Sequence, residues 1–372
     1  MQKRILIFIA ALFVGFLLWR LVPATDQGSD ESIKIGGAFS FTGFSEEWGV
    51  PSRNGVMLAI EDLNKSGGIN GKKMVLVEED TKGTEIGSVG AVHKLADVDS
   101  VKFIIGPTWL DGFGGPRPLS DNGKLLMIAP DSLAAGIQRD HAFPYIFTTW
   151  YRADKEMQAL AKEIALDGMK KVEMFTVKDD FFTELNKNLK NSLIEENISV
   201  GELHELASET SDFRTDLLKA KQSGVDAAFF GFDGEKSLLS FLKQRRELFP
   251  ELRLYASESV SSFIGQEDFK ELTNGVKFVS PADPDNGWKA RYKARFGTEP
   301  IFSASNSYDA VMVLAKALRV GAKTPQEVRE YFLSSTFDTV TFGNIGFDKQ
   351  GGIDGGSFVI KKVVNNAAEL VQ

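Results

Sequence analysis

The sequence has no cysteine among its 372 residues. This absence excludes disulfide bonds, thiol catalysis and metal sites built from cysteine. It also excludes a lipid anchor attached through a cysteine side chain. Histidine is scarce as well, because only His93, His141 and His204 occur and they are far apart in the sequence. We therefore expect no metal site and no histidine-based catalytic centre.

Basic residues are fewer than acidic residues. Lysine and arginine total 43 against 51 aspartate and glutamate residues, which gives a net charge of −8. Surfaces that bind nucleic acid are basic, so we expect no nucleic-acid partner. The length favours two domains at about 150 residues per domain.

Several motifs of catalysis and cofactor binding are missing. The glycines of "GGAFSFTG", residues 36–43, follow a predicted strand but lack the G-x-G-x-x-G and G-K-[ST] spacings that cradle phosphate. Neither G-x-S-x-G nor H-E-x-x-H occurs. Residues 78–80, "EED", are interpreted as a solvated strand end rather than a metal site. No nucleophile is paired with an oriented base, so we expect no catalytic residue and no cofactor.

The N-terminus carries an export signal. Lys3 and Arg4 precede an apolar run over residues 5–18, and Val22 and Ala24 stand at the small-residue positions before a possible cleavage site. If the segment is not cleaved, residues 5–22 are long enough for a membrane anchor with Arg20 at the interface. Residues 1–24 are thus a signal peptide or an anchor, and 25–32 a polar tether. In both cases the body is exported, to the periplasm or the outer face of the cytoplasmic membrane.

From Ile33 onward, strand-like apolar runs alternate with segments of helical periodicity. This alternation predicts α/β structure with parallel sheets and helices on both faces. The runs fall into two mutually similar series, which we interpret as two doubly wound lobes. The strand-like runs of the first series are 33–39, 73–80, 101–105 and 124–130; those of the second are 171–177, 198–206, 225–232, 252–257 and 275–281.

The loop after the third strand is unusual. Residues 104–116 read "IIGPTWLDGFGGP", with Trp109 at the tip of a segment rich in glycine and proline. Open parallel sheets bind ligands at the carboxyl ends of their strands. We therefore expect Trp109 at a ligand-facing edge; the alternative is that it packs under a loop or against the other lobe.

Motifs along nearly the whole body resemble one known family. The sequence resembles the type I periplasmic binding proteins of ABC transporters, in the leucine/isoleucine/valine-binding branch. The matching motifs are Thr42-Gly43, Trp48-Gly49, G-x-x-L-A at 55–59, N-x-x-G-G-I-x-G at 64–71, Asp80, "FIIGP", "LLMIAP", "SNSYDAVMVLAKAL" and "FDKQGGIDG".

The resemblance implies two doubly wound lobes joined by a three-segment hinge. It places residues 33–150 and 280–336 in lobe 1, and residues 151–279 and 337–372 in lobe 2. The three crossings are expected near residues 148–153, 277–284 and 334–342. The lobes are expected to close on a ligand held between strand ends.

The resemblance also assigns site residues in the first lobe. Trp48 stands where an aromatic residue covers the ligand. Leu110 replaces the serine that holds the ligand carboxylate, and Asp131 matches a position whose backbone carbonyl binds the ligand. The family's ligand-binding threonine is also missing. Thr108 and Ser132 lie close enough in sequence to substitute for the lost hydroxyl groups.

In the second lobe the resemblance assigns Phe181, Asp233 and Glu258, the last as the acid that holds the ligand ammonium. The acid is thus kept while the carboxylate-binding hydroxyl groups are not. Aromatic faces and acids attract cations, so an amine is favoured over a free amino acid by Trp48, Trp109 and Phe181 together with Asp131, Asp233 and Glu258. The alternative is that the acids form a solvated rim and the aromatic residues only line the cleft.

These features predict a non-enzymatic, exported solute-binding protein that delivers an amino acid, amide or amine to ABC transporter permease subunits. A second hypothesis is a membrane-tethered ligand sensor that signals to a partner protein. A third is an α/β enzyme, which requires a nucleophile and a base that the sequence does not offer.

Overall fold

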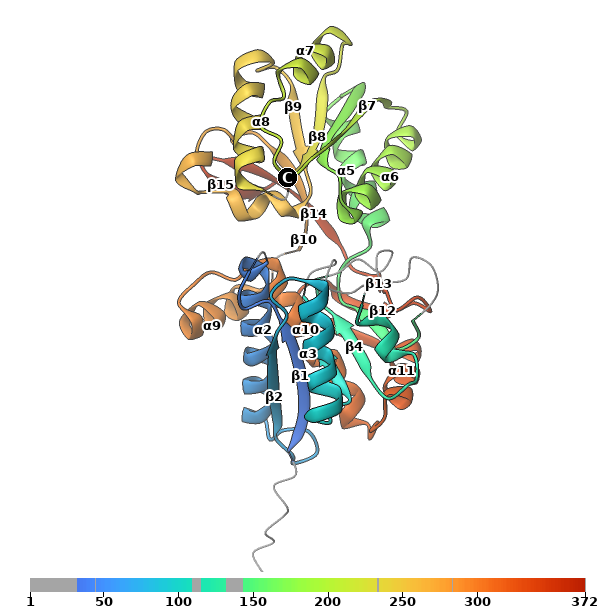
Figure 1. Cartoon of the computed structure of the whole chain (residues 1–372). Helices are drawn as coiled ribbons and strands as arrows, with labels where there is room; N and C mark the ends of the chain where they lie inside the picture. Colours follow the sequence, from blue (N-terminus) through green and yellow to red (C-terminus); the bar gives the residue numbers. More distant parts are fainter. Residues whose placement is uncertain are drawn as a thin grey trace, which may run out of the picture.

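The computed structural model describes residues 32–43, 45–108, 115–131, 143–232, 234–282 and 284–371. It has two lobes, and the chain passes between them three times (Figure 1). The predicted signal or anchor over residues 1–24, and most of the tether, lie outside these ranges. Within them, no helix has the length and apolar character needed to cross a membrane.

Lobe 1 contains a five-stranded parallel sheet in the order β2-β1-β3-β4-β5. Its three inner strands are almost completely buried, as expected for apolar runs covered by helices on both faces. The strands are β1 (Ile33–Phe39), β2 (Met74–Asp80), β3 (Phe103–Ile105), β4 (Leu126–Ala129) and β5 (Ile146–Thr148).

Helices from two distant parts of the chain cover this sheet. α2 packs tightly on α10, where an added Cβ atom at Gly55 would lie only 1.9 Å from the carbonyl oxygen of Ala304. α10 is buried on nearly every side. The main helices of lobe 1 are α2 (Glu46–Lys65), α3 (Glu85–His93), α9 (Asn286–Phe296), α10 (Phe302–Arg319) and α11 (Pro325–Ser334); the short segments η1 (Lys94–Val98) and η3 (Arg117–Ser120) lie between its strands.

Lobe 2 contains a seven-stranded sheet in the order β15-β14-β10-β9-β8-β6-β7. Five strands are parallel, and the last two strands of the chain add to one edge in antiparallel orientation. The strands are β6 (Lys171–Val177), β7 (Ser199–Leu206), β8 (Ala227–Gly231), β9 (Arg253–Ala256), β10 (Lys277–Pro281), β14 (Phe358–Val364) and β15 (Ala367–Leu370). The helices are α5 (Ala153–Leu166), α6 (Asp180–Glu195), α7 (Arg214–Gln222), α8 (Glu235–Leu248), η4 (Glu258–Phe263) and η5 (Glu267–Phe269).

The predicted fold class is confirmed: two α/β lobes with parallel-sheet cores are joined by three segments. The first segment runs from the end of β5 at Thr148 to the start of α5 at Ala153. The second runs from the end of β10 at Pro281 to the start of α9 at Asn286.

The prediction for the third segment was wrong. Residues 337–355 do not belong to lobe 2, because β11 (Thr336–Thr339), β12 (Gly343–Phe347) and β13 (Ile353–Gly355) form a small antiparallel sheet on lobe 1. The rings of Phe337 and Phe347 pack against Phe332 of α11, and Phe347 also contacts Phe147 of β5. Burial of these rings holds the segment on lobe 1, and the chain crosses between β13 and β14, at residues 355–358.

Candidate ligand-binding site

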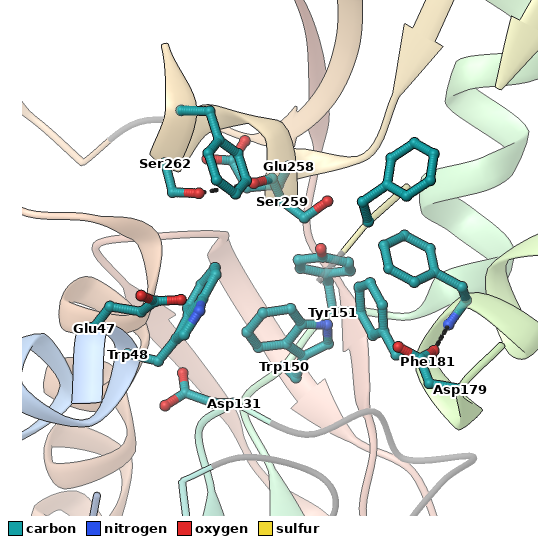
Figure 2. Close-up of a pocket in the computed structure, with 13 residues that line it drawn as sticks. Glu47, Trp48, Asp131, Trp150, Tyr151, Asp179, Phe181, Glu258, Ser259 and Ser262 are labelled. Carbon is teal, nitrogen blue, oxygen red and sulfur yellow. Dashed lines mark hydrogen bonds between the residues drawn. The ribbon is translucent and has the colours of Figure 1, made fainter. Parts of the chain in front are cut away.

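A cavity that is partly open to solvent lies between the two lobes. Its walls combine aromatic rings with carboxylic acids from both lobes (Figure 2). The described residues that line it are Glu47, Trp48, Asp131, Trp150, Tyr151, Asp179, Phe181, Phe182, Phe232, Glu258, Ser259, Ser262 and Phe263.

The first turn of α2 forms one side of the cavity in lobe 1. The backbone N–H of Trp48 donates to the carbonyl oxygen of Ser45 at 3.1 Å, which starts the helix. The carbonyl oxygen of Trp48 accepts a hydrogen bond from the hydroxyl group of Ser303 on α10 at 3.3 Å. These contacts fix the turn, and the side chains of Glu47 and Trp48 face the cavity (Figure 2).

The first interlobe segment contributes two adjacent aromatic residues, Trp150 and Tyr151, whose rings are tilted by 33° to each other. Their ring centroids are 4.8 Å apart, and Trp150 also packs edge-on against Phe302 of α10 at 5.0 Å. Tyr151 contacts Phe358, the first residue of β14, at 5.5 Å. The aromatic floor of the cavity is therefore built on the hinge itself, where it touches elements of both lobes.

Lobe 2 supplies the opposite wall from the ends of its strands. Asp179 caps α6 by accepting a hydrogen bond from the backbone N–H of Phe182 at 2.6 Å. Phe181 lies edge-on to Trp150 at 6.3 Å and to Phe182 at 5.1 Å. Phe182 packs so closely on β8 that an added Cβ atom at Gly231 would lie 1.9 Å from its ring. Glycine at this position therefore lets the Phe182 ring take its place in the wall.

The charged groups of the cavity are all acids. Glu47 and Asp131 come from lobe 1, and Asp179 and Glu258 from lobe 2. No lysine, arginine or histidine occurs among the lining residues that the structure describes. Such a cavity favours a positively charged ligand, because a cation supplies the charge that the walls lack.

Asp131 and Glu258 are the two buried acids of the cavity wall. The side chain of Asp131 accepts a hydrogen bond from the hydroxyl group of Ser52 on α2, with 2.5 Å between the two oxygens. Burial raises the pKa of Asp131 to about 8, and the Ser52 hydrogen bond opposes this shift. The carboxyl group is therefore protonated over much of the neutral range unless a cation pairs with it.

Behind the lining, Glu156 of α5 is fully buried. Burial, reinforced by the nearby Glu258 carboxylate, raises the pKa of Glu156 well above its ordinary value. Burial, together with Glu156 and Glu258, also raises the pKa of Tyr151. The second lobe thus concentrates acidic groups around one end of the cavity.

Four of the nine predicted ligand-binding residues line the cavity: Trp48, Asp131, Phe181 and Glu258. Thr108 does not, because it is 1% exposed and its hydroxyl oxygen accepts a hydrogen bond from the backbone N–H of Ser40 at 3.2 Å. It fastens the ends of neighbouring strands instead. Trp109, Leu110, Ser132 and Asp233 lie outside the described residues.

The sequence reasoning missed Trp150, Tyr151, Phe232 and Phe263 as lining residues. Trp150 and Tyr151 fall inside residues 148–153, where the first crossing was predicted. Two adjacent aromatic residues in a predicted crossing could have been assigned to the site, because a segment that joins the lobes passes beside a cavity between them.

The fold and the cavity define a two-lobed solute-binding protein. Residues 32–363 match the periplasmic binding protein family, and the chain belongs to that family. This confirms the predicted resemblance.

Among curated relatives, the chain is similar to a leucine-, isoleucine-, valine-, threonine- and alanine-binding protein of Pseudomonas aeruginosa. The two are 26% identical over 96% of this chain and 95% of the relative. It is 24% identical to a Leu/Ile/Val-binding protein of Rhizobium johnstonii over 89% of this chain and 91% of the relative.

Among solved structures, the chain resembles the branched-chain amino acid substrate-binding protein of Streptococcus pneumoniae in complex with isoleucine. The TM-score is 0.76, and the two are 21% identical over 92% of this chain and 99% of that one. It also resembles a solute-binding protein of Rhodopseudomonas palustris in complex with benzoate, with a TM-score of 0.76 and 17% identity over 91% and 95% of the two chains. Solved relatives of this fold thus hold chemically different solutes.

Proposed function

We propose that this protein captures a small molecule bearing a positively charged amine in the interlobe cavity. The observation that carries this proposal is the composition of the cavity wall. Four acids and seven aromatic rings line it, without a basic residue among the described lining residues. Aromatic faces attract ammonium groups, and a buried carboxylate is stabilised by a positive counter-charge.

An amino acid is the second candidate ligand. The relatives named as amino-acid-binding proteins favour it, as does Glu258, which stands where the family resemblance places the ammonium-holding acid. The carboxylate of an amino acid needs hydrogen-bond donors. Among the described lining side chains these are the hydroxyl groups of Tyr151, Ser259 and Ser262 and the indole N–H groups of Trp48 and Trp150. The absence of a basic residue among the described lining side chains favours the amine, because an ammonium group needs no positively charged partner.

Delivery of the ligand to an ABC transporter permease completes the proposed function. Membership of the periplasmic binding protein family supports this role, and it supports a binding function rather than catalysis. It also supports location outside the cytoplasm, as do Lys3, Arg4 and the apolar residues after them. If residues 5–22 remain attached, they hold the protein at the membrane surface.

A thermal-shift screen tests the ligand class, because a ligand that binds only the folded state raises the melting temperature. The panel contains primary and quaternary amines, amides, amino acids and aromatic carboxylates. We expect amines to give the largest shifts. Shifts confined to carboxylates would contradict the proposal, and shifts confined to amino acids would select the second candidate.

A further inference from the structure

Asp131 is held rigidly at the carboxyl end of β4. The preceding residue, Pro130, accepts a hydrogen bond through its carbonyl oxygen from the side-chain amide of Asn306 on α10. One carboxyl oxygen of Asp131 accepts the hydrogen bond from Ser52 on α2. Two helices of lobe 1 therefore fix the backbone and the side chain, and the residue is only 8% exposed.

The second carboxyl oxygen of Asp131 has a different environment. It is buried and makes no hydrogen bond with any described residue. The side chain borders the interlobe cavity, below Trp48 in the view of Figure 2. A buried carboxylate without a cation or a full set of donors is less stable than the neutral acid. Geometry alone thus favours the protonated form when no cation is present.

The surrounding charges point the same way. From α2, Glu47 faces the cavity, whereas Arg53 is bound to Glu78 through two hydrogen bonds of 2.5 and 3.0 Å. From α10, the side chain that reaches the strand end is the neutral Asn306. Across the cavity lie Asp179 and Glu258, with the hydroxyl group of Tyr151 between the lobes. None of these groups stabilises a negative charge on Asp131.

We propose that Asp131 carries a proton in the unliganded protein and releases it when a cationic ligand binds, so that ligand capture is coupled to proton release. The O–H bond of the carboxylic acid breaks, the proton passes to solvent, and the ligand cation becomes the partner of the carboxylate. The raised pKa of Asp131, about 8, agrees with this assignment. The inference rests on the proposed amine-binding function.

The test uses benzyltrimethylammonium, a permanent cation that has no ionisable proton. Any proton released on binding therefore comes from the protein. Isothermal titration in phosphate and in ACES, two buffers of different ionisation enthalpy that both work at about pH 6.5, gives the number of protons from the difference in apparent heat. We expect about one proton per bound cation, and an association constant that rises about tenfold per pH unit until about pH 8.

Asp131→Asn is the decisive variant, since asparagine keeps the size of the side chain and an acceptor for Ser52. We expect it to bind the cation without releasing a proton and with a flat pH dependence. Asp309→Asn is the matched control, because Asp309 is another buried acid of lobe 1 that instead accepts hydrogen bonds from the backbone N–H groups of Val340 and Thr341. It should release the same proton as the parent protein.

The outcomes separate the inference from the proposed function. Binding by the parent without proton release would overturn the inference and leave the function standing. Proton release that persists in Asp131→Asn would also overturn it, by assigning the proton to another acid such as Glu156. Failure of both this cation and phenethylamine to bind would overturn the function and the inference together. Infrared difference spectra of the parent, in which the carboxylic acid band disappears on binding, provide a readout that needs no variant.

Discussion

Glu258 begins η4, two residues after the last residue of β9, and its side chain is buried at the cavity wall. We expect Glu258→Gln to weaken binding of phenethylamine at least about tenfold. A hydrogen bond between charged groups contributes roughly 1.5–3 kcal/mol, and about 1.4 kcal/mol corresponds to a factor of ten. Isothermal titration of the variant and the parent measures this ratio.

Glu267→Gln is the control for that experiment. Glu267 belongs to the same region of lobe 2, but its side chain is 85% exposed and pairs with Lys270. Neutralising it changes the net charge by the same amount without touching the cavity, so phenethylamine should bind as in the parent. Equal affinities for Glu258→Gln and the parent would show that Glu258 is not the ligand's counter-charge.

The buried carboxyl group of Asp309 makes the free energy of unfolding depend on pH. Burial raises its pKa to about 7, although Thr341 and the backbone N–H groups of Val340 and Thr341 oppose the shift. The folded state therefore binds this proton more tightly than the unfolded state, whose aspartate has its ordinary pKa near 4. It follows that this group's contribution to the free energy of unfolding is greatest at low pH and declines between about pH 4 and pH 7.

Asp309→Asn removes this titration. The difference in the free energy of unfolding, variant minus parent, should increase by at least about 1 kcal/mol when the pH rises from about 5 to about 8. The reason is that one pKa unit corresponds to about 1.4 kcal/mol. Urea unfolding at both pH values measures the difference. A difference between the two proteins that does not change with pH would show that Asp309 titrates normally.

At this scale, short motifs predicted the parts of the site that lie next to regular elements. Trp48 and Phe181 were identified from the starts of helices, and Glu258 from the end of a strand. Asp131 was identified by the position of its backbone carbonyl and as one of three acids of the site, but the burial of its carboxyl group was not predicted. Trp150 and Tyr151 were missed because their position depends on packing against Phe302 and β14, which are remote in sequence.

At the scale of elements, the contact between α2 and α10 holds lobe 1 together across a separation of about 250 residues. Gly55 permits this contact, because a Cβ atom there would meet the carbonyl oxygen of Ala304 at 1.9 Å. We expect Gly55→Ala to lower the free energy of unfolding by about 1–3 kcal/mol, the usual range for overpacking. Chemical denaturation measures the change.

Gly90→Ala is the matched control. Gly90 lies in the middle of α3, and a Cβ atom at that position would meet nothing within 4 Å. Alanine is better than glycine in a helix by roughly 0.5–1 kcal/mol, so this variant should be slightly more stable than the parent. If both substitutions had the same effect, close packing would not explain the glycine at position 55.

The alternation of strands and helices predicted the two α/β lobes, because buried parallel strands and their covering helices leave clear periodic patterns. The small sheet of β11, β12 and β13 left a weaker signal. Its strands have three to five residues, and they stay on lobe 1 through the packing of Phe337 and Phe347. Such packing is not visible in a local pattern, and the third crossing was therefore placed too early.

At the scale of the whole molecule, we expect the acids on both lobes to couple ligand binding to the distance between the lobes. Asp131 and Glu258 face the cavity from opposite lobes (Figure 2). We expect a cation placed between them to draw the lobes together, since hinge closure around a ligand is a common motion of two-lobed proteins. We expect saturating phenethylamine to reduce the radius of gyration in small-angle X-ray scattering. Scattering curves that do not change on binding would contradict closure.

The central claim is that the cavity selects a positive charge. Phenethylamine, phenylalanine and 3-phenylpropanoate share a phenyl ring and a short chain but differ in charge. Phenethylamine is a cation, phenylalanine is a zwitterion, and 3-phenylpropanoate is an anion. Isothermal titration of the three against the parent protein tests the claim most directly. The acids of the wall predict the tightest binding for phenethylamine, by at least about tenfold over 3-phenylpropanoate. Binding of 3-phenylpropanoate as tight as that of phenethylamine would contradict the account.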